Sequence, residues 1–130
     1  MPVKIKAVSS FKTIQDYQWL EDWCHRVQRA NNSFYTRMNI ATSLGNTVVW
    51  AHNAGKTGLE TLVFFPGART CSMFLDMDNA LAEIKKTHRI FLVDVNGQAS
   101  LSEGKSPSIK SNGYGIWARE VLQQLNIELV

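Results

Sequence analysis

The sequence predicts an α/β protein in which antiparallel strands come first and parallel strands with crossover helices follow. The β-branched and aromatic segments 34–41 and 46–52 are typical of two strands joined around Leu44-Gly45-Asn46. Residues 61–65 and 89–95 are apolar runs without alternation, which is typical of strands buried on both faces of a parallel sheet. A helical pattern lies between these two runs, so the three segments form a right-handed βαβ unit.

The composition is that of a single globular domain. The 130 residues are 45% apolar and 19% charged, which suits one folded unit rather than a disordered chain. The net charge of +3 comes from 14 Lys and Arg residues against 11 Asp and Glu residues, and the basic residues are scattered singly apart from Lys85-Lys86. Nucleic-acid binding usually needs basic residues gathered on one face, so we expect no nucleic-acid partner.

The sequence carries no signal for a membrane, a metal or a cofactor. No apolar run approaches the ~20 residues of a membrane span, and residues 1–12 lack the apolar stretch of a signal peptide. We therefore expect a cytoplasmic protein that binds no membrane. Cys24 and Cys71 show neither metal-ligand nor disulfide spacing, and the three histidines lie far apart. We expect no metal site and no cofactor.

The first element expected along the chain is an amphipathic helix over residues 13–30. Its apolar residues recur at three- and four-residue steps, and Thr13 with Asp16 resembles a capping box. We expect this helix to pack across an edge or end of the domain. A partner-binding or membrane-surface helix is the alternative, disfavoured because the polar face carries acidic residues rather than a band of Lys and Arg. Residues 1–33 are interpreted as an N-terminal helical extension.

Two further helices are expected, at residues 72–86 and 113–125. The apolar face expected for the first consists of Met73, Phe74, Met77, Ala80, Leu81 and Ile84. A long loop rich in Gly, Ser, Asn and Pro, residues 96–112, precedes the second helix. Glu128-Leu129-Val130 has the character of a strand that is just beginning. Strands thus alternate with helices along the chain, without an internal repeat.

Chemistry is expected at the loops that follow the two apolar strands, because α/β sheets bind ligands outside the carboxyl ends of their strands. The loop 66–71 leaves its strand through Pro66-Gly67 and enters a helix. Glycine permits backbone angles that other residues avoid, so Gly67 would let the next amides turn toward a ligand. An amide at a helix N-terminus stabilises an oxyanion. The same Pro-Gly pair is also typical of a plain turn, and the local pattern leaves both interpretations open.

Several segments, in order, resemble the α/β-hydrolases. Residues 62–68 resemble the third strand and the oxyanion loop of that family, and residues 89–94 are similar to its fourth strand, which commonly ends in Val-Asp. Residues 96–102 resemble the loop that follows, and residues 114–127 the helix that leads to the nucleophile strand. Gly45-Asn46-Thr47 and Trp117 are similar to the bacterial carboxylesterase-like branch. The resemblance implies that residues 34–130 are the N-terminal half of a hydrolase domain, ending before the nucleophile strand.

The resemblance implies roles for few positions. The backbone N–H of Ala68 would be one oxyanion-hole donor, with Gly67 allowing its orientation, and Arg69 would border the acyl pocket. Pro66 stands where the family usually has His, and Ala99-Ser100 replace the second glycine of the later loop. Asp94 is expected to be a structural carboxylate that accepts loop amides, because the catalytic acid of the family lies much later.

The nucleophile elbow of the family, Gly-x-Ser-x-Gly, is absent from residues 1–130. Ser72, Ser100 and Ser102 have no adjacent base in the sequence and are expected to be cap or loop residues. Cys71 at a helix N-terminus is a disfavoured alternative nucleophile. The resemblance therefore implies a carboxylic-ester hydrolase that acts on a small-molecule ester by Ser-His-acid acyl transfer, with its catalytic residues beyond residue 130. We expect residues 1–130 alone to be inactive.

A non-catalytic, truncated hydrolase-like module that binds a ligand or a protein is the alternative function. A nucleotide-binding βαβ unit is a weaker one, because neither Gly-x-Gly-x-x-Gly nor Gly-x-x-x-x-Gly-Lys occurs. In the family the third strand lies between the fourth strand and the nucleophile strand. If the chain stops at Val130, residues 61–65 lose one neighbour, and exposed apolar strand edges pair or aggregate. We therefore expect a strand-paired dimer or association with a missing C-terminal half.

Overall fold

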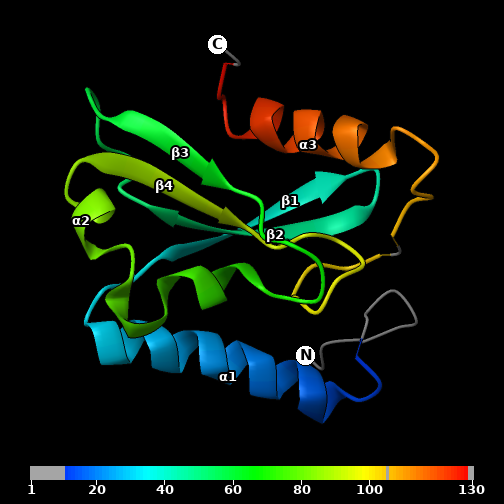
Figure 1. Ribbon diagram of the computed structural model, residues 1–130, viewed down its shortest axis with the longest axis horizontal. Coiled ribbons are helices and arrows are strands. Elements are labelled where there is room, and N and C mark those ends of the chain that lie inside the picture. The colour runs from blue at the N-terminus through cyan, green and yellow to red at the C-terminus, as the bar shows by residue number, and fades with distance from the viewer. Residues whose placement is uncertain (1–10, 105, 129–130) are drawn as a thin grey trace.

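The computed structural model describes residues 11–104 and 106–128, whose four strands form one mixed sheet (Figure 1). β1 (Thr36–Thr42) pairs antiparallel with β2 (Gly45–His52), and β2 pairs antiparallel with β4 (His88–Val93). β3 (Glu60–Phe64) pairs parallel with β4, which gives the order β1-β2-β4-β3. The predicted order of antiparallel and then parallel strands is confirmed.

Helices lie on both faces of this sheet. α1 (Ile14–Asn31) and the 3₁₀ segment η1 (Ser72–Asn79) cover one face, α3 (Gly113–Gln124) covers the other, and α2 (Ala82–Lys85) leads into β4 (Figure 1). The core toward α1 and η1 contains Val48, Trp50, Ile90, Leu92 and Met73, and the core toward α3 contains Val49, Phe91, Val93, Trp117 and Val121. Successive residues of β4 are therefore buried on opposite faces, as its unbroken apolar run predicted.

α1 begins and ends as its sequence predicts, within one residue. The Thr13 hydroxyl accepts a hydrogen bond from the Asp16 amide at 3.1 Å, which satisfies one of the free donors of the first turn. Asn32 ends the helix in the left-handed conformation, with φ of 47°. Leu20 and Cys24 are buried against the sheet. α1 is thus built into the core by its apolar face.

The continuous helix predicted over residues 72–86 is wrong. The segment is η1 followed by the single-turn α2, with non-helical backbone at residues 76–78. The fully buried carboxylate of Asp76 accepts hydrogen bonds from Tyr35 Oη at 2.8 Å, from the Leu81 amide at 3.0 Å and from Lys85 Nζ at 2.7 Å. Asp78 adopts a φ of 55°, a left-handed conformation that Asp and Asn tolerate better than most residues. A buried carboxylate thus replaces helical hydrogen bonds in this segment.

The break also changes which side chains are buried. Met73 and Leu81 of the predicted apolar face lie in the core. Phe74 and Met77 remain 57% and 39% exposed, so the 3₁₀ segment with non-helical backbone at residues 76–78 does not present the apolar face of a continuous α-helix. An exposed aromatic and a thioether therefore lie beside α1.

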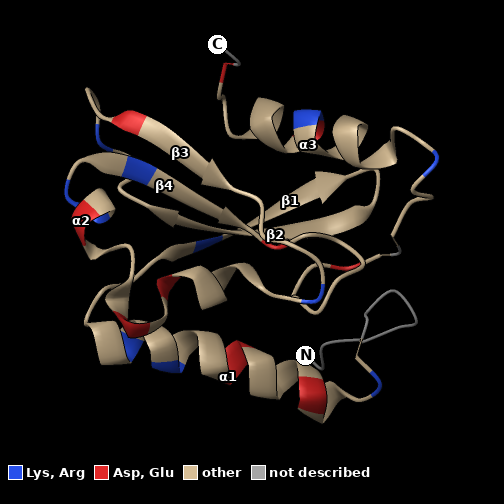
Figure 2. Ribbon diagram, in the orientation of Figure 1, with Lys and Arg blue, Asp and Glu red and all other residues tan. Residues whose placement is uncertain are grey.

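β3 is one of the two edge strands of the described sheet, and β1 is the other. Residues Thr61, Leu62, Val63 and Phe64 of β3 are half-buried rather than buried on both faces, since β4 is their only strand neighbour among the described residues. The strand expected to begin at Glu128-Leu129-Val130 falls mostly on residues outside the described ranges. Lys and Arg are spread over the described elements rather than gathered on one of them (Figure 2). No helix in residues 11–104 and 106–128 is both long enough and apolar enough to cross a membrane.

Candidate functional site

The carboxyl ends of the parallel strands β3 and β4 lie at one edge of the sheet, where two loops leave it (Figure 1). The first runs from Phe65 to Cys71 and enters η1, and the second follows Val93. The Arg69 amide donates a hydrogen bond to Gln98 Oε1 at 2.9 Å, which ties the two loops together. The segments that the sequence indicated as the site are therefore neighbours in space.

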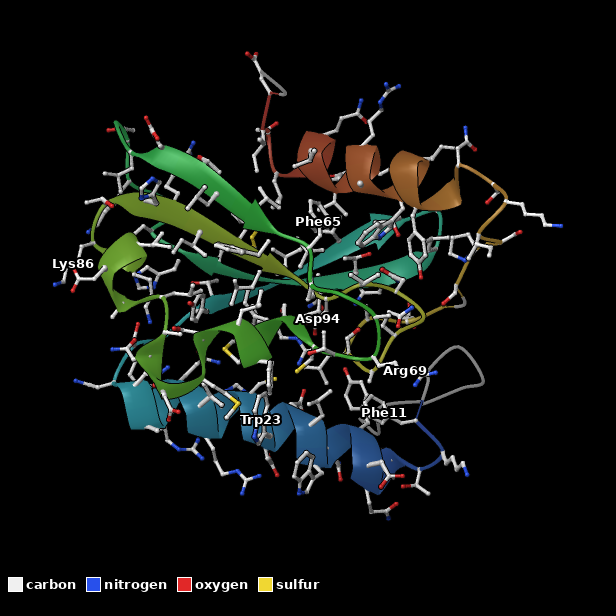
Figure 3. The ribbon with its side chains drawn as sticks, in the orientation of Figure 1. Phe11, Trp23, Phe65, Arg69, Lys86 and Asp94 are labelled. Carbon is white, nitrogen blue, oxygen red and sulfur yellow. The ribbon has the colours of Figure 1, made fainter. Side chains whose placement is uncertain are left out.

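Asp94, at the centre of Figure 3, connects the start of η1 to the second loop through hydrogen bonds. Its Oδ1 accepts hydrogen bonds from the Ser72 amide at 2.9 Å and the Ser72 hydroxyl at 2.6 Å, and its Oδ2 accepts one from the Leu101 amide at 3.1 Å. The side chain is fully buried, and burial raises the pKa of Asp94 above its ordinary value, against the lowering effect of these hydrogen bonds. The expected structural role of Asp94 is confirmed.

Buried polar side chains also order the beginning of the second loop. Asn96 Oδ1 accepts a hydrogen bond from Thr47 Oγ1 at 2.6 Å, and Asn96 Nδ2 donates to the carbonyl of Glu103 at 2.6 Å. The Ser102 hydroxyl donates to the Asp94 carbonyl at 2.7 Å and accepts from the Val48 amide at 2.7 Å. Ser102 is thus a structural loop residue, as expected, while the role of Asn96 was not foreseen because its partners are distant in sequence.

Gly67 and Ala68 border an apolar pocket between the first loop and α3. Its volume is about 450 Å³, and its wall includes Phe65, Pro66, Val95, Tyr114 and Trp117. Within residues 11–104 and 106–128, neither the Gly67 amide nor the Ala68 amide donates to any acceptor, whereas the next amide, that of Arg69, is paired. The pocket is therefore bordered by two residues with amides available to an oxygen of a ligand.

The role expected for the glycine itself needs correction. Gly67 does not adopt a positive φ, and a Cβ placed on it would meet open space. Arg69 makes the left-handed turn instead, with φ of 64°. The left-handed turn of this loop therefore lies one residue after Ala68, and Gly67 does not use the positive φ that only glycine adopts readily.

Arg69 lies away from this pocket. It borders a second groove, on the α1 side of the loop, together with Trp19, Trp23, Cys71 and Phe74. Phe65 and Trp23, labelled in Figure 3, lie above and below the sheet in that view and mark the two sides. The structure thus places Gly67 and Ala68 at one pocket and Arg69 at the other.

Cys24 and Cys71, 47 residues apart in sequence numbering, lie in contact. Both thiols are buried and free. The interaction between the two side chains raises the pKa of Cys24, with burial adding to the effect, and lowers the pKa of Cys71. Because its partner is a second thiol and not a base, Cys71 lacks the arrangement of a catalytic nucleophile. The sequence spacing gave no sign of this contact.

In the part of the chain that the structure describes, no three His, Cys, Asp or Glu side chains come together as metal ligands. The arrangement that remains is an apolar pocket with two available backbone donors, at the carboxyl end of a parallel strand. Such a site can hold a carbonyl oxygen and an apolar substituent.

No protein-family model matches the sequence, and a comparison with curated proteins finds no significant match. Solved structures do match. Naproxen esterase, a carboxylesterase of Bacillus subtilis, superposes with a TM-score of 0.72 at 21% identity over 92% of this chain. The carboxylesterase CesB of Bacillus subtilis gives 0.72 at 16% identity over 90%, and a third Bacillus subtilis protein, provisionally assigned as a hydrolase, gives 0.74 at 22% identity over 89%.

The chain has the fold of the N-terminal part of an α/β-hydrolase. It spans 40% of the length of each of the three proteins. At these identities the likeness is one of fold. The Gly67-Ala68 pocket lies after β3, the strand that the sequence resemblance compared with the third strand of that fold.

Proposed function

We propose that this chain is the substrate-binding N-terminal part of a carboxylic-ester hydrolase. The observation that carries the proposal is the pair of available amides at Gly67 and Ala68, bordering an apolar pocket at the carboxyl end of β3. The fold it shares with two carboxylesterases supports the same function. The substrate is a small-molecule ester, and the residues that make and break bonds lie beyond residue 130.

In the proposed reaction a serine attacks the ester carbonyl, a histidine removes the serine proton, and an acidic residue orients the histidine. Negative charge then develops on the carbonyl oxygen. The Ala68 amide donates a hydrogen bond to that oxygen, and the hydrogen bond strengthens as the charge grows, so it lowers the barrier. The contribution of Asp94 is indirect: it holds Ser72, and with it the end of the loop that carries Ala68.

Residues 34–130 form the hydrolase part in this proposal, and residues 1–33 are an N-terminal extension whose helix α1 packs onto it. The second candidate, a non-catalytic ligand-binding module, is favoured by one observation. Among the described residues, no Ser or Cys side chain hydrogen-bonds to a histidine, and activation of such a nucleophile requires a base.

Ester turnover separates the two candidates. A protein of residues 1–130 should hydrolyse p-nitrophenyl butyrate no faster than the background, because amide donors do not replace a nucleophile and a base. The natural reading frame should continue into a Gly-x-Ser-x-Gly elbow within roughly fifteen residues of Val130, and the longer protein should turn over the ester. A longer protein without the elbow and without turnover would leave the binding module as the function. Saturable turnover by residues 1–130, with label on Cys71 or a serine, would contradict the catalytic assignment.

A further inference from the structure

The two cysteines of the chain meet where α1 packs beside η1 on one face of the sheet (Figure 1). Cys24 lies in α1, and Cys71 is the last residue of the first loop, directly before η1. Both belong to the same buried cluster, and both are free thiols. The proposed hydrolysis uses neither thiol, so the pair is available for other chemistry.

The two thiols differ in their access to solvent. Cys24 is 0% exposed, whereas Cys71 is 7% exposed. Cys71 also borders the groove on the α1 side of the loop, which has a volume of about 620 Å³ and is lined by Leu20 and Trp23 of α1 as well. A small oxidant such as hydrogen peroxide therefore reaches Cys71 before it reaches Cys24.

Cys71 is also the better nucleophile of the pair. Its interaction with Cys24 lowers the pKa of Cys71, and the nearby Phe74 amide adds to this effect, against the opposing effect of burial. The same interaction raises the pKa of Cys24. Because the thiolate and not the thiol attacks a peroxide, Cys71 reacts first.

We propose that Cys24 and Cys71 form a reversible disulfide, made by a peroxide and broken by a thiol reductant, that ties α1 to the first loop. The loop that this bond anchors also contains Gly67 and Ala68, which border the apolar pocket on the α3 side. The pair is thus a redox switch that sets the mobility of one wall of that pocket. This inference does not depend on the proposed ester hydrolysis.

The oxidation takes place in two steps, with hydrogen peroxide as the oxidant. In the first step the Cys71 thiolate attacks one peroxide oxygen, so that an S–O bond forms and the O–O bond breaks. The product on Cys71 is a sulfenic acid. The hydroxide that leaves takes up the proton that Cys71 had lost and becomes water.

In the second step Cys24 Sγ attacks Cys71 Sγ, so that the S–S bond forms and the S–O bond breaks. The oxygen leaves with the Cys24 proton as a second water. The negative charge on Cys71 that raised the pKa of Cys24 is no longer present in the sulfenic acid, so Cys24 loses its proton more readily at this stage. Two thiols are oxidised, and one peroxide is reduced to two waters.

The disulfide restrains a loop that is otherwise held by hydrogen bonds. The Arg69 amide donates to Gln98 and the Ser72 amide donates to Asp94. A disulfide between residues 47 positions apart also restricts the unfolded chain. Oxidation should therefore raise the urea midpoint, and it should make local opening of the first loop rarer.

The test uses residues 1–130 treated with hydrogen peroxide under native conditions and then with iodoacetamide in denaturant. The oxidised chain should take up no label, and peptide mass mapping should find Cys24 joined to Cys71 within one chain. Dithiothreitol should restore both labels. Hydrogen exchange at the Arg69 and Ser72 amides should slow about tenfold or more on oxidation. The Leu125 amide, bonded to Val121 in α3 on the other face, is the control and should exchange at an unchanged rate.

Two variants test the order of attack, with dimedone present to trap sulfenic acid. Cys24→Ala removes the second thiol, so Cys71 should accumulate as its dimedone adduct, about tenfold more than in the unaltered chain. Cys71→Ala leaves only the buried Cys24, which should stay unlabelled. Labelling of Cys24 in the folded Cys71→Ala chain would overturn the assignment of Cys71 as the first thiol to react.

The mass and exchange measurements on the unaltered chain decide the proposal without a variant. Peroxide treatment that stops at a sulfinic acid on Cys71, or that gives disulfides only between chains, would overturn the paired disulfide. A Cys24–Cys71 disulfide that leaves exchange at the Arg69 and Ser72 amides unchanged would overturn its role as a switch.

Discussion

Individual buried carboxylates decide the local structure around the site. Asp94 accepts three hydrogen bonds, two from Ser72 at the start of η1 and one from Leu101 in the second loop. Replacement of Asp94 by Asn turns one acceptor oxygen into an NH₂ donor, which then faces the donor of an amide or a hydroxyl. Because a buried polar group without a partner costs about 1–3 kcal/mol, Asp94→Asn should lower the free energy of unfolding by about that amount. The exposed Asp22→Asn variant in α1 is the control and should change stability by about 0.5 kcal/mol or less.

The pKa of Asp94 gives this prediction a pH dependence. Burial raises the pKa of the folded state above the ordinary value of 3.8, so the folded state holds the Asp94 proton more tightly than the unfolded state does. Between pH 3.8 and the raised pKa, stability from this group therefore falls as the pH rises. Urea unfolding from pH 4 upward measures the loss in free energy of unfolding that Asp94→Asn causes. This loss should become smaller as the pH rises. A loss that grows over that range would mean that the hydrogen bonds outweigh burial.

The backbone conformation of Arg69 is a feature of the site that no local sequence pattern indicated. Its positive φ makes the turn that the sequence assigned to Gly67, and its amide, not that of Ala68, is paired with Gln98. A positive φ at arginine is uncommon and depends on the second loop being in place. The sequence could therefore indicate the position of the loop but not its backbone conformation.

Among the elements, the break between η1 and α2 depends on one buried ion pair. Lys85 Nζ lies 2.7 Å from Asp76, and both side chains are almost completely buried. Asp76→Ala leaves the ammonium without its counter-charge, which should cost about 3–5 kcal/mol. Asp76→Ala combined with Lys85→Met should recover part of that loss, because the second change removes the unpaired charge.

Urea unfolding of the two single variants and the double variant measures this coupling. The exposed pair Lys86–Glu83, at 3.0 Å, provides the control, and Lys86→Ala should change stability by about 0.5 kcal/mol or less. A double variant that is less stable than Asp76→Ala alone would show that Lys85 contributes through its other hydrogen bonds, to Ser33 and Asn79.

The same segment shows where sequence reasoning succeeds and where it fails. The strands, α1 and α3 begin and end within two residues of the predicted positions, because apolar runs, turn residues and caps are local signals. Residues 72–86 also satisfy a helical period, yet Asp76 pairs with Tyr35, which is distant in sequence. The Cys24–Cys71 contact and the groove of Trp19 and Phe74 likewise depend on how α1 packs on η1. A local sequence pattern therefore does not predict contacts between residues that are distant in sequence.

At the level of the whole chain, the sheet has one apolar edge without a described strand neighbour. β3 pairs with β4 alone, and the exposed Phe65 follows it. Unpaired amides and carbonyls on an apolar edge favour strand pairing. Residues 1–130 should therefore associate as their concentration rises, and light scattering over a dilution series measures this.

Hydrogen exchange identifies the surface involved. Amides of residues 61–64 that face away from β4 should become more protected as the protein concentration rises. A monomer at every concentration, with these amides already protected, would show that the edge is covered within the chain itself.

The most direct test of the proposed oxyanion site is the acylation rate of the longer protein with Ala68 altered. Ala68→Pro removes the backbone N–H, whereas Ala68→Gly keeps it and serves as the matched control. If Ala68 holds the developing oxyanion, Ala68→Pro should lower the acylation rate with p-nitrophenyl butyrate about 10²-fold or more, and Ala68→Gly should stay near the unaltered rate. Equal rates for a folded Ala68→Pro protein and its Ala68→Gly control would remove Ala68 from the mechanism.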